Sequence, residues 1–263
     1  MIPQSFWPGK SVIVTGGSSG IGLAVARRAA AAGARVGLLA RTETPLEVAS
    51  AAIRAAGGVA EWAACDVGDV PRVADAVADL ERRLGGVDVA VASAGIHRTS
   101  WPLDARTAAE VIGINVGGCM NLAAAVLPGM LSRGRGRFCG IASIAGVVGL
   151  PGNAAYCASK AAVIAFLESL RLDAAPAGVL VTTVLPGVVD TPMITDAERR
   201  AGGVVSAADA AHAILSGIAR GRPEIWFPRR TAMLARLARS LPPALRDAVL
   251  RGRPRLEESP RPP

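Results

Sequence analysis

Short apolar, β-branched runs alternate with longer alanine-rich segments through most of this 263-residue chain. This pattern predicts strands joined by helices, which favours a parallel sheet covered by helices on both faces. We therefore expect an α/β fold built as a single doubly wound domain. The predicted strands lie near residues 12–15, 35–40, 59–65, 87–92, 137–142, 179–184 and 224–227.

The pattern changes after the last predicted strand. From Arg220 onward there are 11 arginines and 4 acidic residues, so 11 − 4 = +7 of the chain's net charge of +8 lies in this part. We expect residues 1–228 to form the α/β domain and residues 229–263 a basic, amphipathic extension whose proline- and arginine-rich end is disordered. On its first helix, Met233, Leu234, Leu237 and Leu241 share one face, and Arg229, Arg236 and Arg239 lie to another side.

A basic amphipathic helix after a complete domain has two interpretations. It can contact an anionic membrane surface, which would place the protein at the inner face of a membrane. It can instead fold over a substrate cleft or a subunit interface, with the arginines reflecting a compositional bias. Nucleic-acid binding is not expected, because the segment carries no interleaved aromatic residues beyond Trp226 and Phe227.

Targeting and metal signals are also not expected. Residues 1–10 contain two prolines and no long apolar run, so we predict no signal peptide and a cytoplasmic location. No stretch approaches the ~20 uninterrupted apolar residues of a membrane span. The four cysteines lack the spacing of metal ligands, so no metal site is predicted.

A glycine-rich turn follows the first predicted strand. The strand ends at Thr15, and the next residues are Gly16, Gly17, Ser18, Ser19, Gly20, Ile21 and Gly22, which lead into an alanine-rich helix through Ala32. Glycines allow positive φ and close approach of a ligand, and the amino end of a helix favours phosphate. A strand, a glycine turn and a helix in this order predict a dinucleotide site.

The only tyrosine, Tyr156, precedes one of only two lysines, Lys160, by four positions. At this helical spacing the two side chains are neighbours on one face. A phenol has a reference pKa of about 10, and an adjacent ammonium stabilises its anion, so the pair suits proton exchange. The alternative is a buried tyrosine with a surface lysine close by.

Together these features resemble the short-chain dehydrogenase/reductase family over roughly residues 8 to 228. Besides the TGxxxGxG turn and the Tyr156/Lys160 pair, four further features occur in the family's order. They are Asp66-Val67 after the third strand, Asn115 in a helix, Ser143 before Gly146, and a Pro186-Gly187 loop that ends at Thr191.

The resemblance implies an NAD(P)-dependent oxidoreductase that interconverts a carbonyl and an alcohol by hydride transfer. It implies a catalytic tetrad in which Tyr156 is the acid and Ser143 donates a hydrogen bond to the same substrate oxygen. Lys160 would lower the pKa of the phenol and bind the nicotinamide ribose, and Asn115 would hold a water next to Lys160. A sensor that binds the dinucleotide without chemistry is the alternative, but such proteins usually lose the tyrosine or the lysine.

Cofactor preference is expected at the end of the second strand. No acid stands at Ala40 to bind an adenosine ribose, and Arg41 follows; a guanidinium suits a 2′-phosphate. We therefore favour NADP(H) over NAD(H), although Glu43 could neutralise Arg41. The cofactor-binding residues implied are Gly16, Ser18, Ser19, Gly20, Ile21, Gly22, Arg41, Asp66, Val67, Ser93, Ala94, Gly95, Tyr156, Lys160, Pro186, Gly187, Val189 and Thr191.

Two regions leave the substrate open. Ser93 replaces the asparagine common in similar proteins, and we expect weaker stabilisation of the central sheet there. Residues 193–205, before a helix capped by Ser206, resemble the variable lid over the pocket. His97 is interpreted as a solvated loop residue, with a place in the substrate cleft as the alternative. An apolar or lipid-like substrate and a homodimer or homotetramer are expected.

Overall fold

A seven-stranded, fully parallel sheet forms the centre of the computed structural model, which describes residues 5–200 and 203–251. The strand order is β3-β2-β1-β4-β5-β6-β7, so the sheet is doubly wound and the predicted α/β fold is confirmed. The strands are β1 Ser11–Thr15, β2 Arg35–Ala40, β3 Val59–Ala64, β4 Val89–Ala92, β5 Gly136–Ile141, β6 Val179–Pro186 and β7 Glu224–Phe227.

All seven predicted strands are confirmed. The largest differences are at β4, which begins at Val89 rather than at residue 87, and at β6, which ends at Pro186 rather than at residue 184. The helices are α1 Gly20–Ala31, α2 Glu43–Ala55, α3 Val70–Leu84, α4 Ala105–Ile112, α5 Gly118–Ser132, α6 Ala154–Ala174, α7 Asp196–Arg200, α8 Ala207–Ala219, α9 Arg229–Ser240 and α10 Pro243–Arg251, with short turns η1 Gly113–Gly117, η2 Ile144–Gly146 and η3 Ala175–Ala177.

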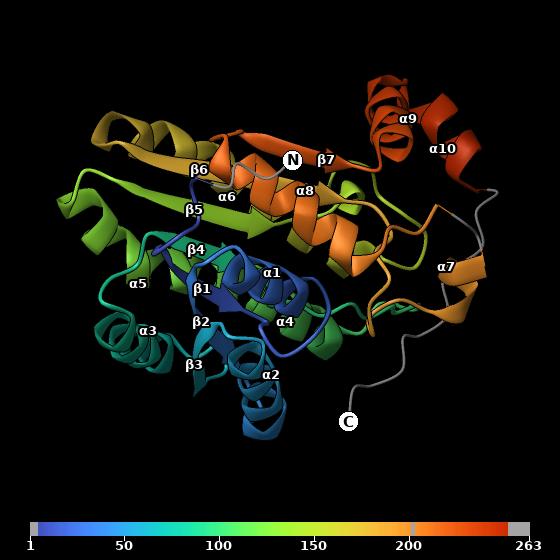
Figure 1. Cartoon of the computed structure of the whole chain (residues 1–263). Helices are drawn as coiled ribbons and strands as arrows, with labels where there is room; N and C mark the ends of the chain where they lie inside the picture. The colour runs from blue at the N-terminus through green and yellow to red at the C-terminus, as the bar shows by residue number, and fades with distance from the viewer. Residues whose placement is uncertain (1–4, 201–202, 252–263) are drawn as a thin grey trace.

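The sheet separates two hydrophobic cores. Val12 and Val14 of β1 pack into one core with α1, α2 and α8, while Ile13 between them packs into the other with α3, α5 and α6. All three side chains are fully buried. A strand covered on both faces needs apolar residues at every position, which explains the continuous runs in the sequence (Figure 1).

The amino-terminal segment contributes to the first core. Trp7, just before the region that resembles the family, is fully buried, and its ring meets that of Phe6 edge-on with centroids 4.9 Å apart. The sequence of residues 1–10 led only to the prediction that no signal peptide is present. A single aromatic residue outside a periodic pattern gave no signal that it would join the core.

The helices that follow the last strand lie at the end of the molecule toward which the strands point. Figure 1 shows α9 and α10 side by side at this carboxyl edge of the sheet, with α7 at the same end of the molecule but apart from them. Helix α9 packs on β7 and on the η2 turn. The division at residue 228 stays a prediction, and the expected disorder of the proline- and arginine-rich end falls on residues 252–263, outside the described residues.

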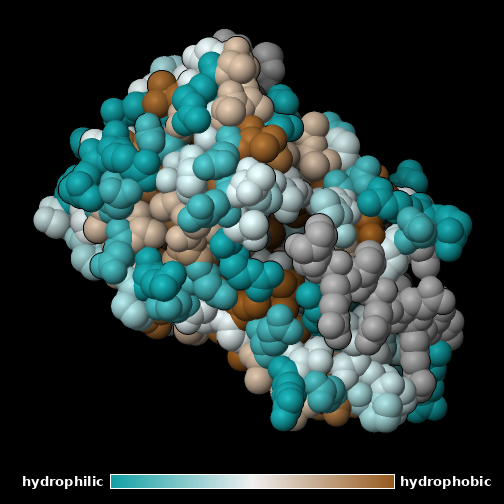
Figure 2. All heavy atoms as spheres, turned by 90° about the horizontal axis from the view of Figure 1, so that it is seen from below, coloured by the Kyte–Doolittle hydropathy of each residue, from teal (hydrophilic) through white to brown (hydrophobic). Residues whose placement is uncertain are grey.

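One helical stretch in the described part of the chain, Ala105–Ser132, is long and apolar enough by composition to cross a membrane. It runs from α4 through η1 to α5 and packs against α3 and α6, and 39 % of its most apolar part is buried. The face shown in Figure 2 is largely polar, with hydrophobic residues in separate patches and in a hollow.

Candidate active site

The glycine turn between β1 and α1 has the backbone geometry that a bound dinucleotide requires. Gly16 and Gly20 have φ angles of 66° and 54°, which favour glycine. A Cβ on Gly22 would lie 2.3 Å from the Gly16 carbonyl oxygen, so only glycine fits there. Ser19, the N-cap of α1, makes no side-chain cap hydrogen bond, which leaves the first N–H groups of the helix for an anion.

The ends of β2 and β3 carry the residues that were expected to bind the adenosine. Gly17 N donates to Leu39 O at 3.1 Å, which holds the glycine turn against the end of β2, immediately before exposed Arg41. Beyond β3, the Asp66 carboxylate accepts a hydrogen bond from Gly68 N at 2.9 Å. Buried Val67 follows Asp66.

The turn after β4 lies between the glycine turn and the four residues of the expected catalytic tetrad. Thr15 Oγ1 accepts hydrogen bonds from Ser93 N and Ala94 N, both at 3.1 Å, so the β1 and β4 ends are joined through backbone amides. A Cβ on Gly95 would lie 3.0 Å from Asn115 Oδ1 and 3.5 Å from Lys160 Nζ. Gly95 therefore allows these two side chains to approach the same turn.

Asn115 lies in the π-helical turn η1, between α4 and α5, and is 2 % exposed. Its Oδ1 accepts from Ile96 N at 2.7 Å, and its Nδ2 donates to Ile96 O at 3.0 Å and to Ser159 Oγ at 2.9 Å. The side chain thus binds the β4 turn and α6 together. The expected water next to Lys160 stays a prediction.

Ser143 follows β5 and opens the η2 turn. Its Oγ accepts a hydrogen bond from Ala145 N at 3.1 Å, so the hydroxyl proton can be donated to a ligand in the cavity. A Cβ on Gly146 would lie 2.6 Å from the carbonyl carbon of Lys160. This close approach seats the Ser143 turn directly on α6.

Helix α6 carries Tyr156 and Lys160 into the cavity. The Lys160 Nζ lies 5.8 Å from the centre of the Tyr156 ring and donates to Ile141 O at 2.9 Å. Lys160 is 6 % exposed, and burial lowers its pKa from the ordinary value of 10.5 to about 8. Loss of hydration disfavours the charged form, as physical chemistry predicts for a buried ammonium.

His97 is the residue whose expected environment was wrong. It is 7 % exposed rather than solvated, its ring centre lies 4.6 Å from that of Tyr156, and its Nε2 lies 2.5 Å from Asn153 Oδ1. Asn153 is the N-cap of α6 and is 1 % exposed. The position of His97, two residues after Gly95, was the one sequence feature that suggested a place in the cleft. No sequence pattern linked His97 to Asn153.

One cavity of about 580 Å³ brings most of the expected residues together. The loop after β6 lies against the glycine turn, since a Cβ on Gly20 would lie 3.3 Å from Thr191 Cγ2. Ser18, Arg41, Asp66, Val67 and Asn115 lie outside its lining. The predicted residues that line it are Gly16, Ser19, Gly20, Ile21, Gly22, Ser93, Ala94, Gly95, Ser143, Tyr156, Lys160, Pro186, Gly187, Val189 and Thr191.

The fold is of the doubly wound α/β class, which binds ligands at the carboxyl ends of its strands, where this cavity lies. Residues 10–201 match the family model described as short chain dehydrogenase, and this chain belongs to that family. Enzymes of this family use NAD(P)(H) and act on carbonyl and alcohol groups. The predicted family is therefore confirmed.

Three relatives illustrate the range of the family. An "Uncharacterized oxidoreductase" of Myxococcus xanthus is 36% identical over 244 residues, 92% of this chain and 96% of the relative. A "Putative ketoacyl reductase" of Streptomyces coelicolor is 41% identical over 69% of this chain and 71% of its own length. The "2-dehydro-3-deoxy-L-rhamnonate dehydrogenase (NAD(+))" of a Sphingomonas species is 38% identical over 72% and 75%.

Proposed function

We propose that this protein is an NADP(H)-dependent oxidoreductase that interconverts a carbonyl and a primary or secondary alcohol on an apolar or lipid-like substrate. One observation carries the proposal: Ser143, Tyr156 and Lys160 line a cavity whose walls away from them are mainly apolar. An acid, a hydrogen-bond donor and a cation around one apolar space suit a substrate with a single reactive oxygen.

The side chains supply the proton chemistry. Tyr156 donates its hydroxyl proton to the substrate oxygen, while Ser143 donates a hydrogen bond to the same atom. The buried charge of Lys160 stabilises the phenolate that remains. Asn115 holds the β4 turn and α6 in register through Ile96 and Ser159. In reverse, Tyr156 accepts the proton of an alcohol.

The residues present fit a nicotinamide dinucleotide, which when bound supplies or accepts the hydride. The amino end of α1 and the tight Gly16–Gly22 turn would hold the pyrophosphate, as the lack of space for a Cβ on Gly22 indicates. Asp66 and Val67 would flank the adenine. Lys160, with donors beyond its bond to Ile141, would bind the nicotinamide ribose.

A preference for NADP(H) is supported by Arg41, an exposed cation that follows β2 with no acid at Ala40. The Sphingomonas relative is named for NAD(+), so an NAD-dependent alcohol dehydrogenase is the alternative for this chain. Replacing Arg41 with alanine is expected to raise the KM for NADPH about tenfold, the range of a lost charge-assisted bond, and to leave the KM for NADH unchanged.

Arg27→Ala is the matched control for Arg41, because Arg27 is an exposed arginine on α1. It should change neither KM. Equal use of both cofactors by the wild type, or equal effects of the two variants, would reject the NADP(H) assignment while leaving the reaction class intact.

Turnover itself is tested by cofactor oxidation with purified protein and a panel of ketones and aldehydes of increasing chain length, with Tyr156→Phe alongside. Loss of the proton donor is expected to lower kcat by about 10²- to 10⁴-fold without loss of NADPH binding. If the dinucleotide binds and neither wild type nor variant turns over any carbonyl, a dinucleotide-binding sensor becomes the better account.

A further inference from the structure

The cavity that contains Tyr156 continues to the two carboxyl-terminal helices. It is lined by the glycine turn and the catalytic side chains, and also by one side of α9 and the last turn of α10; we call these two parts its catalytic end and its α9 end. The residues that these helices contribute to its lining are Thr231, Leu234, Ala235, Leu237, Ala238, Leu241, Val249 and Leu250.

The two ends of this cavity differ in polarity. Among the described lining residues, the ionisable side chains are Lys160, Tyr156 and His97, and all three lie at the catalytic end. At the α9 end, Thr231 is the one polar side chain in the described lining. A charged or strongly hydrated group there would lose water without gaining a partner, whereas an alkyl chain would gain in proportion to the apolar area covered.

Helix α9 is held in place by its other side. Ala232 is buried against Ile144 and Leu185, and the Arg236 guanidinium lies 4.2 Å from the centre of the Trp226 ring. Arg236 also reaches Glu224 at 3.3 Å. These contacts fix the rotation of α9.

With this rotation, part of the apolar face remains open along the cavity. Leu234 and Leu237 line the cavity yet are 58 % and 61 % exposed, as is Val249 of α10 at 61 %. Through Ile144 the helix rests on the turn that begins at Ser143. The open apolar side chains therefore continue directly from the catalytic end.

We propose that α9 and α10 form a binding subsite for an aliphatic tail of the substrate, and that this subsite sets the chain-length preference of the enzyme. The occupant is a neutral alkyl chain whose reactive carbon lies at Tyr156. This inference rests on the proposed function only for the position of the reacting group.

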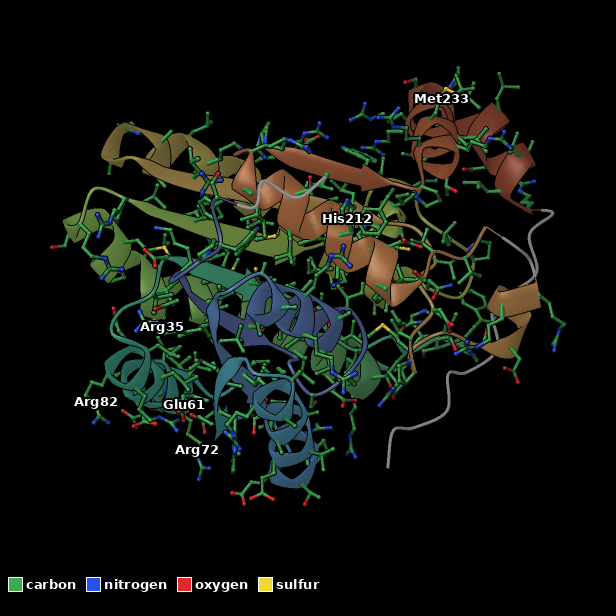
Figure 3. All side chains as sticks on the ribbon, in the orientation of Figure 1. Arg35, Glu61, Arg72, Arg82, His212 and Met233 are labelled. Carbon is green, nitrogen blue, oxygen red and sulfur yellow. The ribbon has the colours of Figure 1, made fainter. Side chains whose placement is uncertain are left out.

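The first test measures kcat/KM with NADPH for a homologous series from butan-2-one to dodecan-2-one. Each added methylene that reaches the subsite is expected to raise kcat/KM about fourfold, until the cavity is full. Leu237→Gln should flatten this dependence. Met233→Gln is the matched control, because Met233, expected on the same face as Leu237, does not line the cavity. It is 66 % exposed and points away from the body of the protein in Figure 3. This control variant should keep the wild-type dependence.

A second measurement separates this inference from the reaction. Secondary alcohols of the same chain lengths are titrated calorimetrically into the protein with NADPH, a combination that cannot react. Affinity that rises with chain length in wild type and Met233→Gln but not in Leu237→Gln supports the subsite even if no ketone is reduced. Turnover with no dependence on chain length in either experiment overturns the subsite and leaves the proposed reaction standing.

Binding to phosphatidylglycerol vesicles tests the competing interpretation, in which the same apolar face docks on a membrane. If wild type cosediments with them, Leu237→Gln does not, and the chain-length dependence is the same in both proteins, the face docks on a membrane and the subsite is rejected. Thermal unfolding of each variant with NADPH present shows whether a loss comes from misfolding.

Discussion

Two helices border the same cavity and are held in very different ways. Helix α6, of 21 residues, buries seven of them, including Lys160. Helix α9, of 12 residues, buries only Ala232. Helix α6 is fixed by the core that contains Ile13 and by the Ser143 turn. Helix α9 is fixed by the small cluster of Ala232, Ile144 and Leu185 and by Arg236.

In the proposed function, this difference separates the part of the cavity where the proton is exchanged from the part proposed to hold the rest of the substrate. Side chains that exchange a proton must be placed within fractions of an ångström, and dense packing around α6 provides that. Residues of a helix that is held by few contacts can be substituted without disturbing the core.

The largest effect is expected where the buried helix is altered, at Lys160. Lys160→Met should lower kcat/KM by at least about 100-fold, since the phenolate loses its cation. In the wild type, kcat/KM should fall as the pH rises through about 8, where Lys160 loses its proton. Steady-state pH profiles measure both.

The free energy of unfolding should depend on pH in the direction opposite to kcat/KM, and this dependence should also need Lys160. The pKa of Lys160 is lower in the folded protein, about 8, than its ordinary value of 10.5, so the unfolded chain binds more protons between these pH values. Folding stability attributable to this group is therefore lowest below pH 8 and rises toward pH 10.5, by about 3 kcal/mol. Lys160→Met should remove this rise in denaturant unfolding.

Lys10→Met is the matched control for Lys160, because Lys10 is the other lysine and is partly exposed beside Asp88. It should retain both the activity and the rise in stability. The same pH dependence in Lys160→Met as in Lys10→Met would contradict the assignment.

An intermediate effect is expected at His97, which lies between the two ends. His97→Phe keeps a ring against Tyr156 but removes the contact between His97 Nε2 and Asn153 Oδ1, and a lost buried hydrogen bond is worth about 1 kcal/mol. We expect kcat to fall about fivefold while the KM for NADPH stays constant. His212→Phe is the control, because His212 lies on α8 and does not line the cavity. Equal effects of the two variants would exclude a positioning role for His97.

The smallest effect is expected where the loosely held helix is released. Arg236→Ala removes the contact with Trp226 and an ion pair that is largely exposed, so the free energy of unfolding should change by less than about 1 kcal/mol. We expect a higher KM for long-chain ketones with little change in kcat. A fall in kcat as large as that of His97→Phe would mean that α9 also supports the Ser143 turn.

Much of this molecule could be predicted because local chemistry decided it. The strands follow from continuous apolar runs, and the glycine turn follows from residues that tolerate positive φ or exclude a Cβ, as at Gly16 and Gly22. His97 was misjudged because its burial depends on Asn153, 56 positions away. Trp7 was missed because a lone aromatic residue has no periodicity.

The sequence by itself determined that a parallel sheet would present a dinucleotide turn beside a tyrosine and a lysine at helical spacing. It also determined that α9 would have an apolar side. Only the tertiary structure decided where that side faces, because an amphipathic pattern requires that a face be covered without specifying by what. Packing of Ala232 and Arg236 against β6, β7 and the η2 turn sets the rotation of α9, and this rotation turns Leu234 and Leu237 toward the cavity.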